Sequence, residues 1–96
     1  MEVPIIRRTA LFYEYVTEDL VERRAPLRPE HIGLVREWIA EGRMLMAGAL
    51  GSPPHGGLLV FASEDPADAD EFASIDPYVR NGLVTDWRVE PWNVVS

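Results

Sequence analysis

Apolar residues occur in short runs along this chain, and the first run predicts a β-strand. Residues 11–16 (LFYEYV) are rich in aromatic and branched side chains, which favour an extended backbone. The polar residues 17–19 (TED) follow, and we expect them to open a short helical turn that ends near Pro26.

Helical periodicity is clearest in the next segment, which we expect to form the main helix. Residues 28–31 (RPEH) open it, because a proline in the first turn already has the φ angle of a helix and no amide hydrogen to leave unpaired. Gly42 ends the helix, since glycine readily adopts the left-handed conformation of a helix cap. The apolar positions at helical spacing are Ile32, Leu34, Val35, Trp38 and Ile39.

Two further apolar runs predict a β-hairpin. Residues 44–50 (MLMAGAL) have the pattern of a buried strand, and residues 58–62 (LLVFA) have the pattern of the strand that follows it. The segment between them contains three glycines and two prolines, which restrict it to a loop.

A second helix is predicted after the hairpin. Asp65 is expected to cap it, with Pro66 at its first position. The pair Asp76-Pro77 interrupts this helix, because the residue before a proline is pushed out of the α region. Residues 77–81 are expected to add one helical turn that stops at Gly82.

The last strand is predicted over residues 83–89, where apolar and polar positions alternate and give the strand unequal faces. Pro91 and Trp92 follow in a short apolar tail. The order of elements is then β-α-β-β-α-β, which is the ferredoxin-like α+β arrangement of a four-stranded antiparallel sheet. Right-handed crossovers place both helices on one face of that sheet. The other face would be bare, and since a bare apolar face needs a cover, we expect a homodimer in which two sheets stack.

Composition excludes several kinds of chemistry. The 96 residues are expected to form a single domain, residues 1–96. The chain has no Cys, which excludes disulfides, thiol nucleophiles and Cys-bound zinc. All nine basic residues are Arg, which excludes Schiff-base and P-loop lysines. The two histidines, His31 and His55, cannot supply a three-His zinc site within one chain.

The charge balance bears on partners and location. The net charge of −7 disfavours nucleic acid and anionic membranes as partners. Arg23, Arg24 and Arg28 form a local basic cluster, which we interpret as a solvated face. No apolar run has the length of a membrane span and the first residues lack a signal-peptide pattern, so a cytoplasmic location is expected.

Two side chains are candidates for proton transfer, and each has a structural alternative. His31 lies within the apolar stripe of the main helix and in its first turn, where a neutral imidazole would be a plausible base. Spacing alone favours a core histidine bonded to backbone. Asp76 precedes a proline, as Asp65 does, and this pattern is typical of a helix cap. Both roles are compatible for Asp76, because a capping carboxylate has lone pairs left for an imidazole.

Other residues offer weaker indications. Tyr78 could supply a hydroxyl to a pocket or simply pack, and Arg28, one turn before His31, could hold an anionic substrate group or form an exposed ion pair. His55 lies in the loop and is expected to be solvated. The three tryptophans, which we expect in the core or at the dimer interface, are Trp38, Trp87 and Trp92.

Taken together, these segments resemble the YCII-related (YciI-like) domain family over nearly the whole chain. The departures are the longer N-terminus, residues 1–10, to which no element is assigned, and the loop at residues 52–55. The matching segments, in chain order, are residues 28–31, 41–43, 46–50, 56–60, 76–83 and 91–92.

The resemblance implies a ferredoxin-like fold that dimerises as an α+β barrel. It also implies a shared His and Asp in a cleft, thought to act as a dyad, which correspond to His31 and Asp76. At least one family member catalyses dehydrochlorination in aromatic degradation, whereas most have no assigned substrate. The resemblance therefore reverses the preference for structural roles at these two positions.

The leading interpretation is a small dimeric enzyme, a lyase or isomerase that needs no cofactor. His31 would be the general base, Asp76 would orient it, and Arg28 or Tyr78 would help to bind the substrate. The alternative is a non-catalytic ligand-binding or interaction module, in which the His-Asp pair is structural and sealed from solvent. Metal capture by His31 and Asp76 ranks last, because the sequence names no further ligands.

Overall fold

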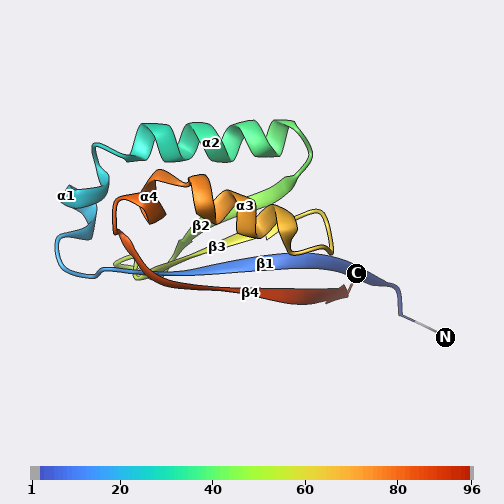
Figure 1. The fold of residues 1–96 in the computed structure, drawn as a ribbon. Helices are drawn as coiled ribbons and strands as arrows, with labels where there is room; N and C mark the ends of the chain where they lie inside the picture. Colours follow the sequence, from blue (N-terminus) through green and yellow to red (C-terminus); the bar gives the residue numbers. More distant parts are fainter. Residues whose placement is uncertain (1–2, 96) are drawn as a thin grey trace.

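A four-stranded antiparallel sheet forms one layer of the molecule, and all the helices lie on one of its faces (Figure 1). The computed structural model describes residues 3–95. The strands are ordered β2-β3-β1-β4 across the sheet, which confirms the ferredoxin-like fold. The elements in chain order are β1 (Ile5–Tyr15), α1 (Leu20–Arg24), α2 (Arg28–Ala40), β2 (Met44–Leu50), β3 (Gly56–Phe61), α3 (Ala67–Ile75), α4 (Pro77–Arg80) and β4 (Val84–Val95).

The outer ends of β1 and β4 are longer than the sequence pattern predicts. Ile5 pairs with Val95 and Thr9 pairs with Pro91, so much of the unassigned N-terminal segment and the predicted apolar tail form one continuous pairing. Residues 1–2 of that segment lie outside the described residues. Pro91 is tolerated within β4 because β4 is an edge strand, whose outward amide positions need no partner.

Strand β2 has the predicted bounds but not the predicted burial. Met44 is its one buried residue, because β2 forms the other edge of the sheet and is hydrogen-bonded on one side only. Its apolar side chains are therefore largely exposed, and Met46 has 60% of its surface accessible. The prediction of a buried strand was wrong for this reason.

The helices begin and end close to the predicted residues. Helix α2 follows the prediction, and Gly42 has a φ angle of 77° just beyond its end. Helix α3 begins at Ala67, one residue later than expected, although Asp65 Oδ1 still accepts a hydrogen bond from the Ala67 amide at 2.9 Å. Gly82, with a φ angle of 76°, follows α4.

The core lies between the sheet and the helix layer. Its centre is a group of aromatic rings in edge-to-face contact, in which Trp38, Phe61 and Phe72 lie 5.2–5.9 Å apart between ring centroids. Arg43 closes one end of this layer, because its guanidinium stacks 3.6 Å from the Trp38 ring centroid and pairs with Asp68 at 2.9 Å. Helices α2 and α3 are thereby fixed to each other above β1 and β3.

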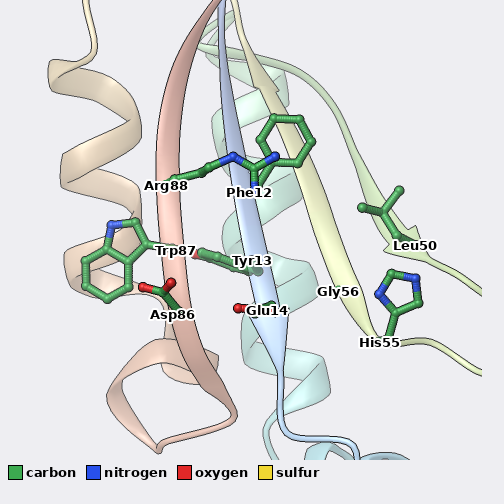
Figure 2. A pocket seen from close by; sticks show the side chains of 9 residues that line it. All are labelled: Phe12, Tyr13, Glu14, Leu50, His55, Gly56, Asp86, Trp87 and Arg88. Atoms are coloured by element: carbon green, nitrogen blue, oxygen red, sulfur yellow. The ribbon is translucent and has the colours of Figure 1, made fainter.

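The opposite face of the sheet carries no helix, as Figure 1 shows. Phe12 and Leu58 are half-buried at its centre, and Trp92, 43% exposed, lines two hollows beside Leu58. A larger hollow of about 390 Å³ lies near the β2–β3 hairpin, where Arg88 covers the Phe12 ring and His55 lies beside Leu50 (Figure 2). We call this surface the bare face.

None of the helices in the described range is long and apolar enough to cross a membrane.

Candidate active site

A fully buried carboxylate lies at the break between α3 and α4. Asp76 has an extended backbone (ψ 123°) because Pro77 follows it, and this turn directs its side chain back into the helix layer. Its Oδ1 accepts hydrogen bonds from the Tyr78 amide at 3.0 Å and from His31 Nδ1 at 2.8 Å. The carboxylate therefore caps α4 and holds the imidazole at the same time, which is the compatibility that its free lone pairs predicted.

Tyr13 provides the third hydrogen bond to this carboxylate. Its hydroxyl donates to Asp76 Oδ2 at 2.8 Å, and the contact is buried. Burial raises the pKa of the Tyr13 hydroxyl far above its ordinary value, and the charge of Asp76 adds to the rise, so this group is a permanent donor at neutral pH. Sequence reasoning missed Tyr13 as a site residue. The alternation of β1 places it on the helix-facing side, but alternation does not identify a polar partner.

His31 reaches the carboxylate from the first turn of α2. Its ring lies flat on Tyr78, with 3.8 Å between centroids and 6° between planes, and its edge faces Phe72. Because Asp76 accepts at Nδ1, the proton of a neutral His31 resides on Nδ1 and the lone pair resides on Nε2. In the described residues 3–95, every buried side-chain nitrogen or oxygen has a hydrogen-bond partner. Nε2 of His31 has no such partner, because the hydrogen bond of this ring is made by Nδ1. Nε2 is therefore open to solvent.

The opening is a cleft of about 170 Å³ between α2 and the helix-facing side of the sheet, which we call the His31 cleft. His31 is 8% exposed at this cleft, whereas Asp76 behind it is not exposed at all. The residues that line it are Tyr15, Arg24, Arg28, His31, Ile32, Val35, Ala47, Gly48, Ala49, Leu59 and Tyr78. A buried His-Asp pair with one free nitrogen facing a cleft has the geometry that general-base chemistry needs.

Two cations and two phenols border the same space. Burial raises the pKa of the Tyr15 and Tyr78 hydroxyls, and both remain protonated at neutral pH. The nearby Arg24 counteracts part of this rise at both hydroxyls, and Arg28 does so at Tyr78. The His31 cleft is thus electropositive at one side, in a protein whose net charge is −7.

The structure brings together four of the residues that the sequence singled out. His31, Asp76, Arg28 and Tyr78 meet at one cleft, whereas exposed His55 lies at the hairpin beside the bare face.

Arg24 also borders this cleft, although the sequence placed it in a solvated face.

Trp38 is in the core, as predicted, whereas Trp87 and Trp92 are partly exposed. Within residues 3–95, no three His, Asp or Glu side chains converge as metal ligands would.

Fold and cleft define a ferredoxin-like α+β protein with a His-Asp pair beside a small-molecule-sized cavity. The family model of the YCII-related domain matches residues 9–93, which include every residue of the His31 cleft. The chain therefore belongs to the YCII-related domain family, which confirms the resemblance seen in the sequence.

Solved structures with the same fold span most of this chain. The 5-chloro-2-hydroxyhydroquinone dehydrochlorinase from Burkholderia phenoliruptrix AC1100, determined in complex with 2,5-dihydroxybenzoquinone, has a TM-score of 0.72 at 17% identity over 88% of this chain and 92% of its own. A protein provisionally assigned as an antibiotic biosynthesis monooxygenase, from Deinococcus radiodurans, has a TM-score of 0.54 at 13% identity, over 92% and 91% of the two chains. A dimeric ferredoxin-like protein from an uncultured marine organism has a TM-score of 0.54 at 12% identity, over 97% and 90%. These identities show a shared fold, and the comparison with curated proteins finds no match.

Proposed function

We propose that this protein is a small-molecule lyase or isomerase that moves a proton with His31 and needs no cofactor. The observation that carries the proposal is the 2.8 Å hydrogen bond between His31 and fully buried Asp76, with the other imidazole nitrogen open to a cleft. A structural pair would be sealed on both sides, whereas this pair has one protected end and one accessible end.

The geometry supports a simple sequence of proton movements. Nε2 of His31 accepts a proton from an acidic C–H of the substrate, and the electron pair stays on that carbon. In a lyase, this pair forms a C=C bond as a leaving group on the neighbouring carbon departs with its own bonding pair. In an isomerase, the imidazolium returns the proton to a different carbon. Asp76 stabilises the imidazolium and fixes the orientation of its ring, and Tyr13 fixes Asp76.

One of the structural neighbours supports this class of reaction. The dehydrochlorinase with the same fold is named for a reaction that eliminates hydrogen chloride from a hydroxylated ring, which is lyase chemistry. Arg28 and Tyr78 border the cleft beside His31, and we assign them to substrate binding.

The test is deuterium exchange at the acidic C–H groups of a panel of small cyclic compounds: chlorinated hydroquinones, lactones and aromatic acids in D₂O. We expect exchange or turnover of at least one compound, and a loss of roughly 10²–10⁴-fold in His31→Asn, as for removal of a general base. His55→Asn is the matched control, because His55 is the other histidine of this chain and lies away from the cleft. Equal rates in the wild type and His31→Asn would remove His31 from the mechanism.

A non-catalytic ligand-binding module is the second candidate, and the three hydrogen bonds to Asp76 favour it, since they also join α2, β1 and α4 structurally. In that case, compounds would bind in the His31 cleft without exchange. His31→Asn would lower the melting temperature, and neither the wild type nor this variant would exchange a proton of any compound.

We also propose that the protein is a homodimer whose bare faces stack. The support is the apolar surface at its centre, with Phe12, Leu58 and Trp92, and the dimeric ferredoxin-like neighbour of the same fold.

A further inference from the structure

Two arginines from different helices border the His31 cleft. Arg24 is the last residue of α1 and Arg28 is the first residue of α2. The turn between them is closed by the Leu27 amide, which donates to the Arg24 carbonyl at 2.9 Å. Helix α1 lies at the end of the sheet beside the start of α2 (Figure 1), and this placement brings both side chains to one cleft.

Neither guanidinium is neutralised by the described part of the chain. Within residues 3–95, no carboxylate lies within ion-pair distance of Arg24 or Arg28, although the chain has 16 acidic residues. Arg43, by contrast, pairs with Asp68 and Glu71. Arg24 is half-buried, and Arg28 is exposed with a side-chain hydrogen bond to Tyr78. Because neither is paired with a carboxylate, both have donors left for an anion that enters the cleft.

Other arginines outside ion pairs have no such setting. Arg36 and Arg80 are exposed, as Arg28 is, but neither of them lines the His31 cleft. Arg24 and Arg28 differ because they face a cavity that also contains the free nitrogen of a buried His-Asp pair.

The phenols beside the arginines add neutral donors. Tyr15 and Tyr78 are in edge-to-face contact, with 6.1 Å between their ring centroids, and both line the cleft. The Tyr15 hydroxyl lies against Gly57, where a Cβ would come within 2.8 Å of it, so the absence of a side chain there makes room for this hydroxyl. Hydroxyls that stay protonated can donate to an oxyanion alongside the guanidinium groups.

The remaining walls are apolar and set the size of the ligand. Ala47 and Ala49 of β2 face Ile32 and Val35 of α2 across the cleft. The volume of about 170 Å³ accommodates a single six-membered ring, because an apolar protein cavity of about 150 Å³ can hold benzene. The space between these walls therefore favours a single ring over a fused bicyclic compound.

From these observations we infer that the substrate is a compact carboxylate of one-ring size. Its carboxylate binds between Arg24 and Arg28, and its acidic C–H lies at His31 Nε2. A carboxylate suits the paired guanidinium groups because each can donate two parallel hydrogen bonds. The position of the acidic C–H at His31 rests on the proposed function. The binding of the carboxylate between Arg24 and Arg28 does not depend on that function.

The probe is benzoate, and its affinity is measured by isothermal titration calorimetry and by NMR. Benzyl alcohol serves as the neutral isostere, and inorganic phosphate serves as the competing anion. We expect benzoate to bind at the His31 cleft and benzyl alcohol to bind more weakly. Arg24→Gln and Arg28→Gln should each weaken benzoate binding by about tenfold, the effect of one charge-assisted hydrogen-bonding group. Arg23→Gln is the matched control from the same helix, and it should change the affinity less than twofold.

Three results would overturn the inference: no binding of benzoate, equal effects of Arg23→Gln and Arg24→Gln, or tighter binding of phosphate than of benzoate. Tight binding of 2-naphthoate would overturn the size limit. Ala49→Leu should abolish benzoate binding by filling the cleft, with circular dichroism to verify the fold. His31→Asn should still bind benzoate, so this assay separates failure of the anion site from failure of the proton-transfer proposal.

Discussion

Asp76 receives donors from three parts of the chain, and its neighbours determine how firmly it is held. The His31 and Tyr78 donors share Oδ1, whereas the Tyr13 hydroxyl is the donor to Oδ2. Because no surface of Asp76 is exposed, water cannot replace a missing donor.

Tyr13→Phe is expected to destabilise the fold by about 1–3 kcal/mol at neutral pH, since it leaves Oδ2 buried without its donor. Burial raises the pKa of Tyr13 in the folded state, so its proton binding stabilises the protein fully below pH 10 and progressively less above it. Urea unfolding between pH 8 and 11.5 measures this. The free energy of unfolding should fall more steeply with pH in the wild type than in Tyr13→Phe, and parallel curves would contradict the assignment.

At single positions, the sequence alone could not decide between structure and chemistry. The spacing around His31 favours a core histidine bonded to backbone. Asp76 has the same pattern as Asp65, whose carboxylate accepts a hydrogen bond from the Ala67 amide next to the start of α3 but does not cap it, since Pro66 is the N-cap. The resemblance to the family raised both residues to site candidates. Tyr13 stayed hidden because its partner lies 63 residues away, and nothing local in β1 identifies that partner.

For helices and strands, a bound could be predicted where its cause lies in neighbouring residues, and not where it lies in pairing with a distant strand. Helix α2 was predicted correctly at both ends, because Pro29 and Gly42 act on their own local backbone. Strand β1 was predicted six residues too short at its start, since residues 5–10 owe their extended form to pairing with residues 90–95. Burial of β2 was mispredicted because an edge position is a property of the sheet and not of the strand.

Two glycines, one in α2 and one in β3, give a matched test of how tightly the chain packs around each element. Gly33 lies in α2 with open space where a Cβ would be, so Gly33→Ala should stabilise the protein by roughly 0.5–1 kcal/mol through helix propensity. Gly56 lies in β3, where a Cβ would come within 2.6 Å of the Tyr13 carbonyl oxygen, so Gly56→Ala should destabilise it by about 1–3 kcal/mol. Thermal and urea unfolding compare the two, and effects of the same sign would contradict this description of the packing.

The whole molecule is asymmetric, with a helix layer on one face of the sheet and an uncovered surface with an apolar centre on the other. The two partly exposed tryptophans of β4 differ in which face they occupy. Trp92 pairs with Arg8 on the bare face, whereas Trp87 pairs with Tyr13 and lies on the helix side. Their exposures, 43% and 45%, are nearly equal.

Trp92→Glu is therefore expected to convert the proposed dimer to a monomer, because it introduces a charge into the stacked faces, whereas Trp87→Glu should leave the dimer intact. Light scattering across a concentration series measures the mass, and circular dichroism verifies the fold of each variant. A wild-type mass near 10.8 kDa, or dissociation by both substitutions equally, would refute assembly through the bare face.

The three hydrogen bonds to Asp76 also bear on the order in which the molecule folds. Their donors lie 2, 45 and 63 positions away, so the local cap can form early while the other two bonds wait for long loops to close. We expect the His31–Asp76 pair to form after the local cap of α4, because 45 positions of the chain separate its two residues. A nascent chain that has not yet supplied residue 76 would carry His31 without its carboxylate partner, so the proposed proton transfer could begin only after Asp76 has folded into place.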